Sequence, residues 1–165
     1  MYYIIGFINE LKNQNLLQQF EFTLGGKGPL YEFFKDQNKY SNVKLPGFVP
    51  DQEIPELYRS HNLFVVPTLF EGMPTVVLEA MSYGLPVIVS DVGATAVLVD
   101  HNNGRVIAPG SVEELVNALK WFLSLSLKER KNLSDSSYQK FIKGFTWPVV
   151  AAQYNKLFKS LAASA

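Results

Sequence analysis

The sequence has no cysteine, no net charge and no long hydrophobic run. The absence of cysteine excludes disulfides, a thiolate nucleophile, iron–sulfur clusters and every cysteine-based zinc site. Because 15 basic residues balance 15 acidic ones, we expect no nucleic-acid partner, which would normally require a basic excess. No apolar run approaches the roughly 20 residues that span a bilayer, and the start of the chain does not resemble a signal peptide. These absences favour a cytoplasmic protein.

The composition is typical of one folded domain. With 165 residues, of which 47% are hydrophobic and 18% are charged, the chain can bury a core of ordinary size. Short apolar runs alternate with helical patterns, and the continuous runs Leu63–Val66 and Val87–Val89 are typical of parallel strands buried on both faces. We predict strands at residues 2–7, 20–24, 43–45, 63–67, 87–90 and 105–107. We predict helices at residues 10–19, 29–35, 52–60, 74–83 and 94–99.

This alternation predicts an α/β fold, a doubly wound, Rossmann-like parallel sheet of about six strands with helices on both faces. After about residue 110 the pattern is helical throughout. The last helix carries an aromatic stripe that includes Tyr154 and Phe158. We expect the helices of residues 111–163 to pack on this single domain, which spans residues 1–165.

Ligands of such sheets bind beyond the carboxyl ends of the strands, where Glu71 and Gly72 follow a predicted buried strand. The free amides of the next helix, around Thr75, would stabilise an anion such as a diphosphate. Glu79 lies in an otherwise apolar helix, and its carboxylate needs a partner because desolvation of a lone charge is costly. A ribose diol would satisfy Glu79. So would the amides of a neighbouring loop or a basic side chain.

Two further turns follow predicted strands. The turn at Gly26-Lys27-Gly28 matches neither the G-x-G-x-x-G dinucleotide fingerprint nor the P-loop, so a nicotinamide oxidoreductase is not favoured. It is either a tight turn or a ligand contact. The rigid turn that contains Phe48 and Val49 would suit a nucleotide base.

These segments together resemble a known family. The run Gly26-Lys27-Gly28-Pro29-Leu30, and the run from Pro67 through Phe70-Glu71-Gly72-Met73-Pro74 into Leu78-Glu79-Ala80, are similar to the C-terminal, donor-nucleotide-binding domain of retaining GT-B glycosyltransferases of the glycogen synthase and sucrose synthase-like group. The resemblance covers essentially the whole chain. It is carried most specifically by the two glutamates separated by seven residues.

The resemblance implies a role for each motif. Glu71 would be the catalytic residue, contacting the transferred sugar and steadying a positively charged transition state. Glu79 would hold the ribose hydroxyls, while Phe48 and Val49 would border the base. No metal and no cofactor are implied, because amides and basic side chains neutralise the diphosphate. The implied donor site comprises Lys12, Gly26, Lys27, Gly28, Phe48, Val49, Gly72, Met73, Pro74, Thr75, Val76 and Glu79.

The chain departs from this family in three respects. Phe7 stands where the family usually has a diphosphate-binding arginine, although Lys12 matches the lysine that follows. The crossover between Lys12 and Phe20 is short. One Rossmann-like domain is also only half of a GT-B fold, so the resemblance implies an N-terminal acceptor domain that we expect to be absent from this chain.

We therefore expect the nucleotide-sugar half, most simply a UDP-sugar half, of a retaining hexosyltransferase of polysaccharide biosynthesis, inactive alone. Any peripheral contact with the inner face of a membrane would be made through the missing half. The alternatives are a non-catalytic interaction domain, which Phe7 favours, and half of a GT-B sugar-nucleotide epimerase.

Overall fold

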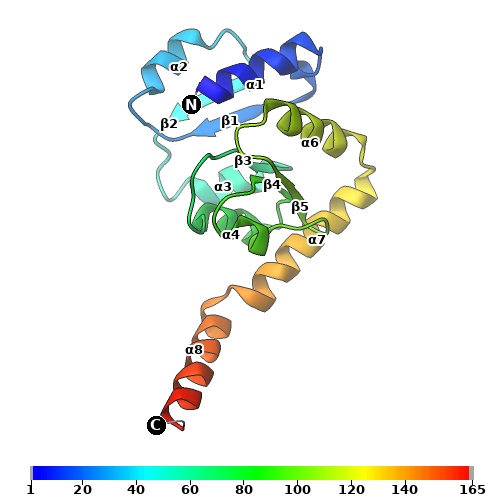
Figure 1. The fold of residues 1–165 in the computed structure, drawn as a ribbon. Helices are drawn as coiled ribbons and strands as arrows, with labels where there is room; N and C mark the ends of the chain where they lie inside the picture. Colours follow the sequence, from blue (N-terminus) through cyan, green and yellow to red (C-terminus); the bar gives the residue numbers. More distant parts are fainter. Residues whose placement is uncertain (1, 164–165) are drawn as a thin grey trace.

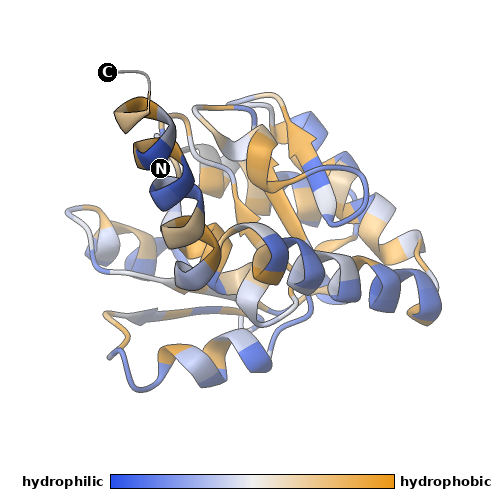
Figure 2. Ribbon diagram, turned by 90° about the horizontal axis from the view of Figure 1, so that it is seen from below, coloured by the Kyte–Doolittle hydropathy of each residue, from blue (hydrophilic) through white to orange (hydrophobic). Residues whose placement is uncertain are grey.

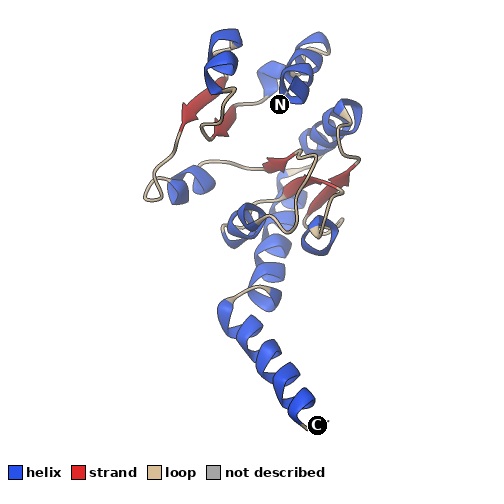
Figure 3. Cartoon of the chain, turned by 60° about the vertical axis from the view of Figure 1, so that its left-hand side comes forward, coloured by secondary structure: helices blue, strands red, loops and turns tan. Residues whose placement is uncertain are grey.

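The computed structural model describes residues 2–163, and its strands form two parallel sheets (Figure 3). The first sheet pairs β1 (Phe22–Gly25) with β2 (Val43–Gly47). The second has the order β3-β4-β5, formed by Phe64–Val66, Val87–Ser90 and Gly104–Ile107. The predicted α/β class is thus confirmed, with five described strands instead of about six, and with two sheets instead of one.

Helices connect these strands and complete the chain (Figure 1). Their bounds are α1 (Tyr2–Asn13), the short 3₁₀ helix η1 (Leu17–Gln19), α2 (Tyr31–Gln37), α3 (Ile54–Arg59), α4 (Thr75–Ser82), α5 (Thr95–Leu98), α6 (Val112–Ser124), α7 (Leu127–Gly144) and α8 (Trp147–Ala162).

The strand predicted at residues 2–7 is wrong, because this segment is the first half of α1. Its apolar residues continue at helical spacing, so that Ile4, Phe7, Ile8 and Leu11 all contribute to one hydrophobic cluster. A short apolar run can be a strand or part of a buried helix. Here the apolar residues recur at the roughly 3.6-residue spacing of a helix over the whole segment, which favours the helix. The helix predicted at residues 10–19 is interrupted, since α1 ends at Asn13 and the 3₁₀ turn η1 follows.

The core is centred on β4, whose four residues are all buried. One face of the three-stranded sheet packs with α1 and α6 around Ile88 and Ile107. Val87 and Val89 point to the other face, where they meet Val77 and Met81 of α4. The apolar strands therefore lie between helical layers, and in Figure 2 the strands at the centre of the molecule are largely orange, the colour of hydrophobic residues.

Two of the three C-terminal helices pack as predicted, and the third does not. The α6 helix covers the core with α1, and α7 lies against α4, where buried Ser137 donates a hydrogen bond to the carbonyl of Leu85 (2.7 Å). In contrast, α8 projects away from the body (Figure 1) and buries none of its described residues; Trp147 is 87% exposed. The chain leaves the helical path at Phe145 and restarts in another direction, with Pro148 in the first turn. The predicted packing of the aromatic stripe is therefore wrong.

No helix among residues 2–163 combines the length and the apolar character needed to cross a membrane.

A partly buried ion pair anchors α7, and its removal should weaken the fold at neutral pH. Lys140 Nζ lies 2.7 Å from Asp100 Oδ2, and this hydrogen bond is the main cause that lowers the pKa of Asp100 below its ordinary value. The contribution of Asp100 to the free energy of unfolding is therefore complete above its unfolded-state pKa of about 3.9. It is lost as the pH falls through the lower pKa of the folded state. Because solvent screens both groups, we expect Lys140→Met to cost about 1 kcal/mol or less at pH 7, measured by urea unfolding.

Lys131→Met supplies the matched control, because Lys131 pairs with Asp135 on the same helix but both side chains are mostly exposed. The free energy of unfolding of the Lys131→Met variant should differ little from that of the unaltered chain at any pH. An equal loss in the two variants, or a Lys140→Met loss that persists at pH 2, would contradict the assigned role of the Asp100 pair.

Candidate functional site

The loops beyond the carboxyl ends of β3 and β4 contact each other. The backbone N–H of Ala94, in the loop after β4, donates to the carbonyl of Gly72, in the loop after β3 (2.7 Å). Gly93 has a φ of 56°, and a Cβ atom there would collide with the backbone carbonyls of Glu71 and Gly72. A closely packed glycine therefore holds the Glu71-Gly72 segment in position.

The N-terminus of α4 begins directly after this segment. Pro74 is the N-cap residue, and no side chain caps the helix. The Val77 N–H is satisfied within the turn by the Pro74 carbonyl (3.1 Å). The positive end of the α4 dipole thus lies just beyond Gly72, where it can stabilise an anion. This arrangement brings Glu71, Gly72, Met73, Pro74, Thr75, Val76 and Glu79 together in one loop and helix, as the sequence predicted.

Glu79 has a partner that the sequence analysis missed. The hydroxyl of Tyr58, at the end of α3, donates a hydrogen bond to Glu79 Oε2 (3.0 Å). Burial of Tyr58, together with the hydrogen bond and the charge of Glu79, raises the pKa of this tyrosine well above its ordinary value. The phenol therefore stays protonated and remains a donor at any ordinary pH. Oε1 of Glu79 makes no hydrogen bond to the described residues.

The sequence alone did not mark Tyr58 as a partner of Glu79. In the structure it is the one buried residue of the short helix α3, whose other positions are partly or largely exposed. A buried tyrosine usually satisfies its hydroxyl with a polar group. The sequence pattern did not reveal which group that would be, because 21 residues separate Tyr58 from Glu79.

The predicted glycine turn lies beyond β1 and β2. The N–H of Gly26 donates to the carbonyl of Gly47 (2.7 Å), and Gly26 has a φ of 123° that disfavours other residues. Lys27 lies over the ring of Tyr31, 6.0 Å from its centroid. Gly26, Lys27 and Gly28 are thus at the same sheet edge as Phe48 and Val49. Among residues 2–163, no backbone hydrogen bond joins this group to the Glu71–Glu79 segment.

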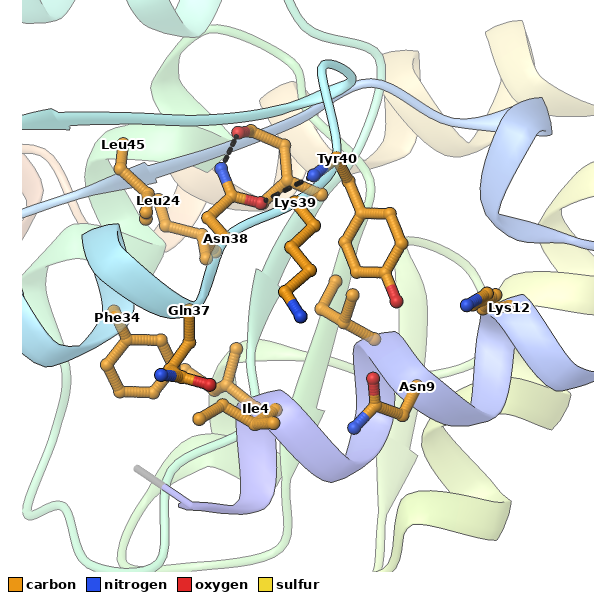
Figure 4. A pocket seen from close by; sticks show the side chains of 13 residues that line it. Ile4, Asn9, Lys12, Leu24, Phe34, Gln37, Asn38, Lys39, Tyr40 and Leu45 are labelled. Atoms are coloured by element: carbon orange, nitrogen blue, oxygen red, sulfur yellow. Dashed lines mark hydrogen bonds between the residues drawn. The ribbon is translucent and has the colours of Figure 1, made fainter.

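Lys12 does not join either group. It is in the last turn of α1, with its amine 5.8 Å from the centroid of the Tyr40 ring. Tyr40 precedes β2, whereas the predicted site follows the end of that strand. Lys12 instead lines a cavity of about 320 Å³ between α1, α2 and the β1-β2 sheet (Figure 4). The structure therefore gives no support to Lys12 as a diphosphate ligand.

Phe7 also has a different role from the one its sequence position suggested. It is buried in α1 and makes an edge-to-face contact with Phe22, with ring centroids 5.8 Å apart. It does not lie in a loop at a strand end, so it does not occupy the position of a diphosphate-binding arginine. The argument that Phe7 marks a lost ligand site, and hence an interaction domain, loses its basis.

Comparison with known proteins decides the family. The model of the family described as glycosyl transferases group 1 matches residues 2–124, most of the chain. The chain belongs to this family. It is 35% identical over 111 residues to the UDP-Gal:alpha-D-GlcNAc-diphosphoundecaprenol alpha-1,3-galactosyltransferase of Escherichia coli, an alignment that covers 64% of this chain and 28% of the relative. It is 33% identical over 142 residues to the MMP alpha-(1->4)-mannosyltransferase of Mycolicibacterium hassiacum, covering 82% of this chain and 34% of that protein.

Solved structures share the fold of this group 1 glycosyltransferase domain. Sucrose-phosphate synthase from Thermosynechococcus elongatus superposes with a TM-score of 0.74 at 24% identity, over 88% of this chain and 39% of that one. HepE of Anabaena, solved in complex with UDP, gives a TM-score of 0.74 at 23% identity, over 86% and 41% of the two chains. The chain thus spans about a third of the length of the curated relatives above.

The glycosyltransferase domain exposes large apolar side chains next to the predicted site residues. Phe48 is 73% exposed and Phe70 is 89% exposed, and Leu69, Met73 and Val76 are exposed as well. All five follow the carboxyl end of β2 or β3. These side chains make the segments that follow β2 and β3 an exposed apolar surface.

Proposed function

We propose that this chain is the donor-binding half of a retaining glycosyltransferase and binds a nucleotide sugar, in the simplest case a UDP-sugar. The observation that carries the proposal is the uncapped N-terminus of α4, flanked by Glu71 on its loop side and by Glu79 one turn inside. A diphosphate suits the positive helix end. A ribose suits a carboxylate that keeps one oxygen free of protein hydrogen bonds.

Each group then has a distinct task. The first-turn amides of α4 receive the diphosphate, and Lys27 adds a positive charge without a metal ion. Glu79 accepts hydrogen bonds from the ribose hydroxyls, and Phe48 and Val49 border the base. Glu71 contacts the transferred sugar and stabilises the positive charge that develops as its bond to the diphosphate breaks.

Two findings support the nucleotide and the need for a second domain. UDP occurs in the name of the Escherichia coli relative and in the HepE complex, which has the same fold. The matched segments cover only 28% and 34% of the two relatives, which are therefore much longer than this chain. We therefore propose that an N-terminal domain supplies the acceptor groups and any contact with a membrane, and that the isolated chain transfers no sugar.

Glu79→Gln tests the proposal. We expect the chain to bind UDP with a Kd of roughly 0.1–1 mM, because half a cleft contributes only part of the usual contacts. The substitution keeps the shape of the side chain but removes the charge that strengthens both ribose hydrogen bonds, so the affinity should fall about tenfold or more. Isothermal titration calorimetry with UDP measures the change in Kd.

Glu56→Gln is the matched control, because Glu56 is an exposed carboxylate on α3 that makes only a 3.8 Å contact with Arg59. It should leave the affinity for UDP unchanged. The ribose assignment is wrong if Glu79→Gln and Glu56→Gln bind UDP equally well, and the donor-site proposal is wrong if the unaltered chain binds no nucleoside diphosphate at millimolar concentration.

A further inference from the structure

We infer that Tyr58 is a positioning residue that orients Glu79 toward the ribose, and thereby sets how strongly the site selects a ribonucleotide. The inference rests on the proposed donor-binding function. Tyr58 and Glu79 come from different helices, α3 and α4. Their hydrogen bond is therefore a tertiary contact that links two elements at the edge of the site.

The hydrogen bond gives the two carboxylate oxygens of Glu79 different roles. Tyr58 Oη donates to Oε2 of Glu79 at 3.0 Å, which leaves Oε1 free to accept from a ligand. The same hydroxyl lies 3.5 Å from the carbonyl of Val76, in the first turn of α4. The phenol thus contacts both the glutamate and the helix end to which we assign the diphosphate. One side chain fixes the relative position of these two ligand contacts.

Aromatic contacts hold the ring of Tyr58 in place. Phe64 of β3 meets it edge-on with centroids 5.6 Å apart, and Tyr83 stacks on it at 5.3 Å with an interplanar angle of 18°. The guanidinium of Arg59 covers Tyr83 at 5.3 Å from the ring centroid. Because the ring is buried and contacted on several sides, its hydroxyl is presented in one direction before any ligand arrives.

Glu79 needs such an anchor. A glutamate loses more rotamer freedom than most side chains when it is ordered, and Glu79 is largely exposed. Among residues 2–163, no cation forms a salt bridge with it, and Tyr58 is its side-chain hydrogen-bond partner. Without the Tyr58 hydroxyl, the Glu79 side chain would sample several rotamers. Ribose binding would then have to order this side chain, which would lower the affinity.

The test compares Tyr58→Phe with Tyr83→Phe and titrates each with UDP and with 2′,3′-dideoxy-UDP. Tyr58→Phe retains the stacked ring and removes only the hydroxyl. Tyr83→Phe removes a hydroxyl from the other ring of the same stack and serves as the control. We expect Tyr58→Phe to weaken UDP binding by about 3–10-fold, to leave dideoxy-UDP binding unchanged, and Tyr83→Phe to change neither.

An equal loss for both nucleotides would overturn the inference, since it would mean that Tyr58 supports the site only structurally. Unchanged binding of UDP and dideoxy-UDP by Tyr58→Phe would also overturn the inference. A second readout needs no ligand: the ¹³C signal of the Glu79 carboxylate should shift in Tyr58→Phe and stay in place in Tyr83→Phe. If the unaltered chain binds neither nucleotide, the donor-site proposal fails, and this signal alone still decides whether Tyr58 orients Glu79.

Discussion

In the proposed enzyme, in which an acceptor domain is joined to this chain, Glu71→Gln is expected to lower kcat for sugar transfer by about 10²–10³-fold. The transferred sugar develops positive, oxocarbenium-like charge as its bond to the leaving group breaks. In the role proposed above, the Glu71 carboxylate in the β3–α4 loop stabilises that charge, and a neutral amide of the same shape does not. Because the charge exists only in the transition state, KM for the donor should change little. Initial rates over a range of donor concentrations measure both constants.

The control for this prediction is Glu113→Gln, which neutralises an exposed carboxylate in the first turn of α6. It should leave kcat and KM unchanged. A Glu71→Gln enzyme with normal kcat and a raised KM would show that Glu71 serves substrate binding and not the transition state, and would remove it from the catalytic role proposed above.

Gly93→Ala should cause a large loss of both stability and nucleotide binding. The new Cβ would collide with the carbonyls of Glu71 and Gly72, and the φ of 56° is itself unfavourable for alanine. Relief of the collision requires the two loops to separate, which breaks the 2.7 Å hydrogen bond from Ala94 to Gly72. We expect a loss of about 2–4 kcal/mol in urea unfolding, together with at least a tenfold weaker affinity for UDP.

Gly144→Ala separates this effect from the general cost of replacing glycine. Gly144 is the last residue of α7, and an added Cβ would meet no atom within 4 Å. The substitution should be neutral or slightly stabilising. If Gly93→Ala unfolds at the same urea concentration as the unaltered chain and binds UDP normally, the Glu71-Gly72 segment does not depend on this contact.

Much of the fold was readable from local pattern. The apolar run at Val87–Ser90 predicted β4 at its observed bounds, because a strand buried on both faces leaves an uninterrupted apolar signature. Pro74 at the start of α4 and Gly84 with a φ of 72° after its end were likewise readable, since each residue type suits its backbone position. The segment from Glu71 to Glu79 was predicted for the same reason, as a loop and a helix that are contiguous in the chain.

The failures concern segments whose environment lies far away in the sequence. Residues 2–7 are apolar enough for a strand or a buried helix, and packing of Phe7 and Leu11 against β1, β2 and α6 accompanies the helix. The stripe on α8 predicted burial on the domain, but hydrophobic spacing says only that a face is apolar and does not say what covers it.

The sequence by itself determined the α/β class, the order of most helices and strands, and the glutamate-bearing loop before α4, because these depend on residues within one or two turns of each other. Only the tertiary structure decided that Tyr58 holds Glu79, that Gly93 holds the Glu71-Gly72 segment, and that Lys12 lies apart from both. These are contacts between elements separated by 20 or more residues. Their geometry follows from how the helices pack on the sheets, which no local pattern encodes.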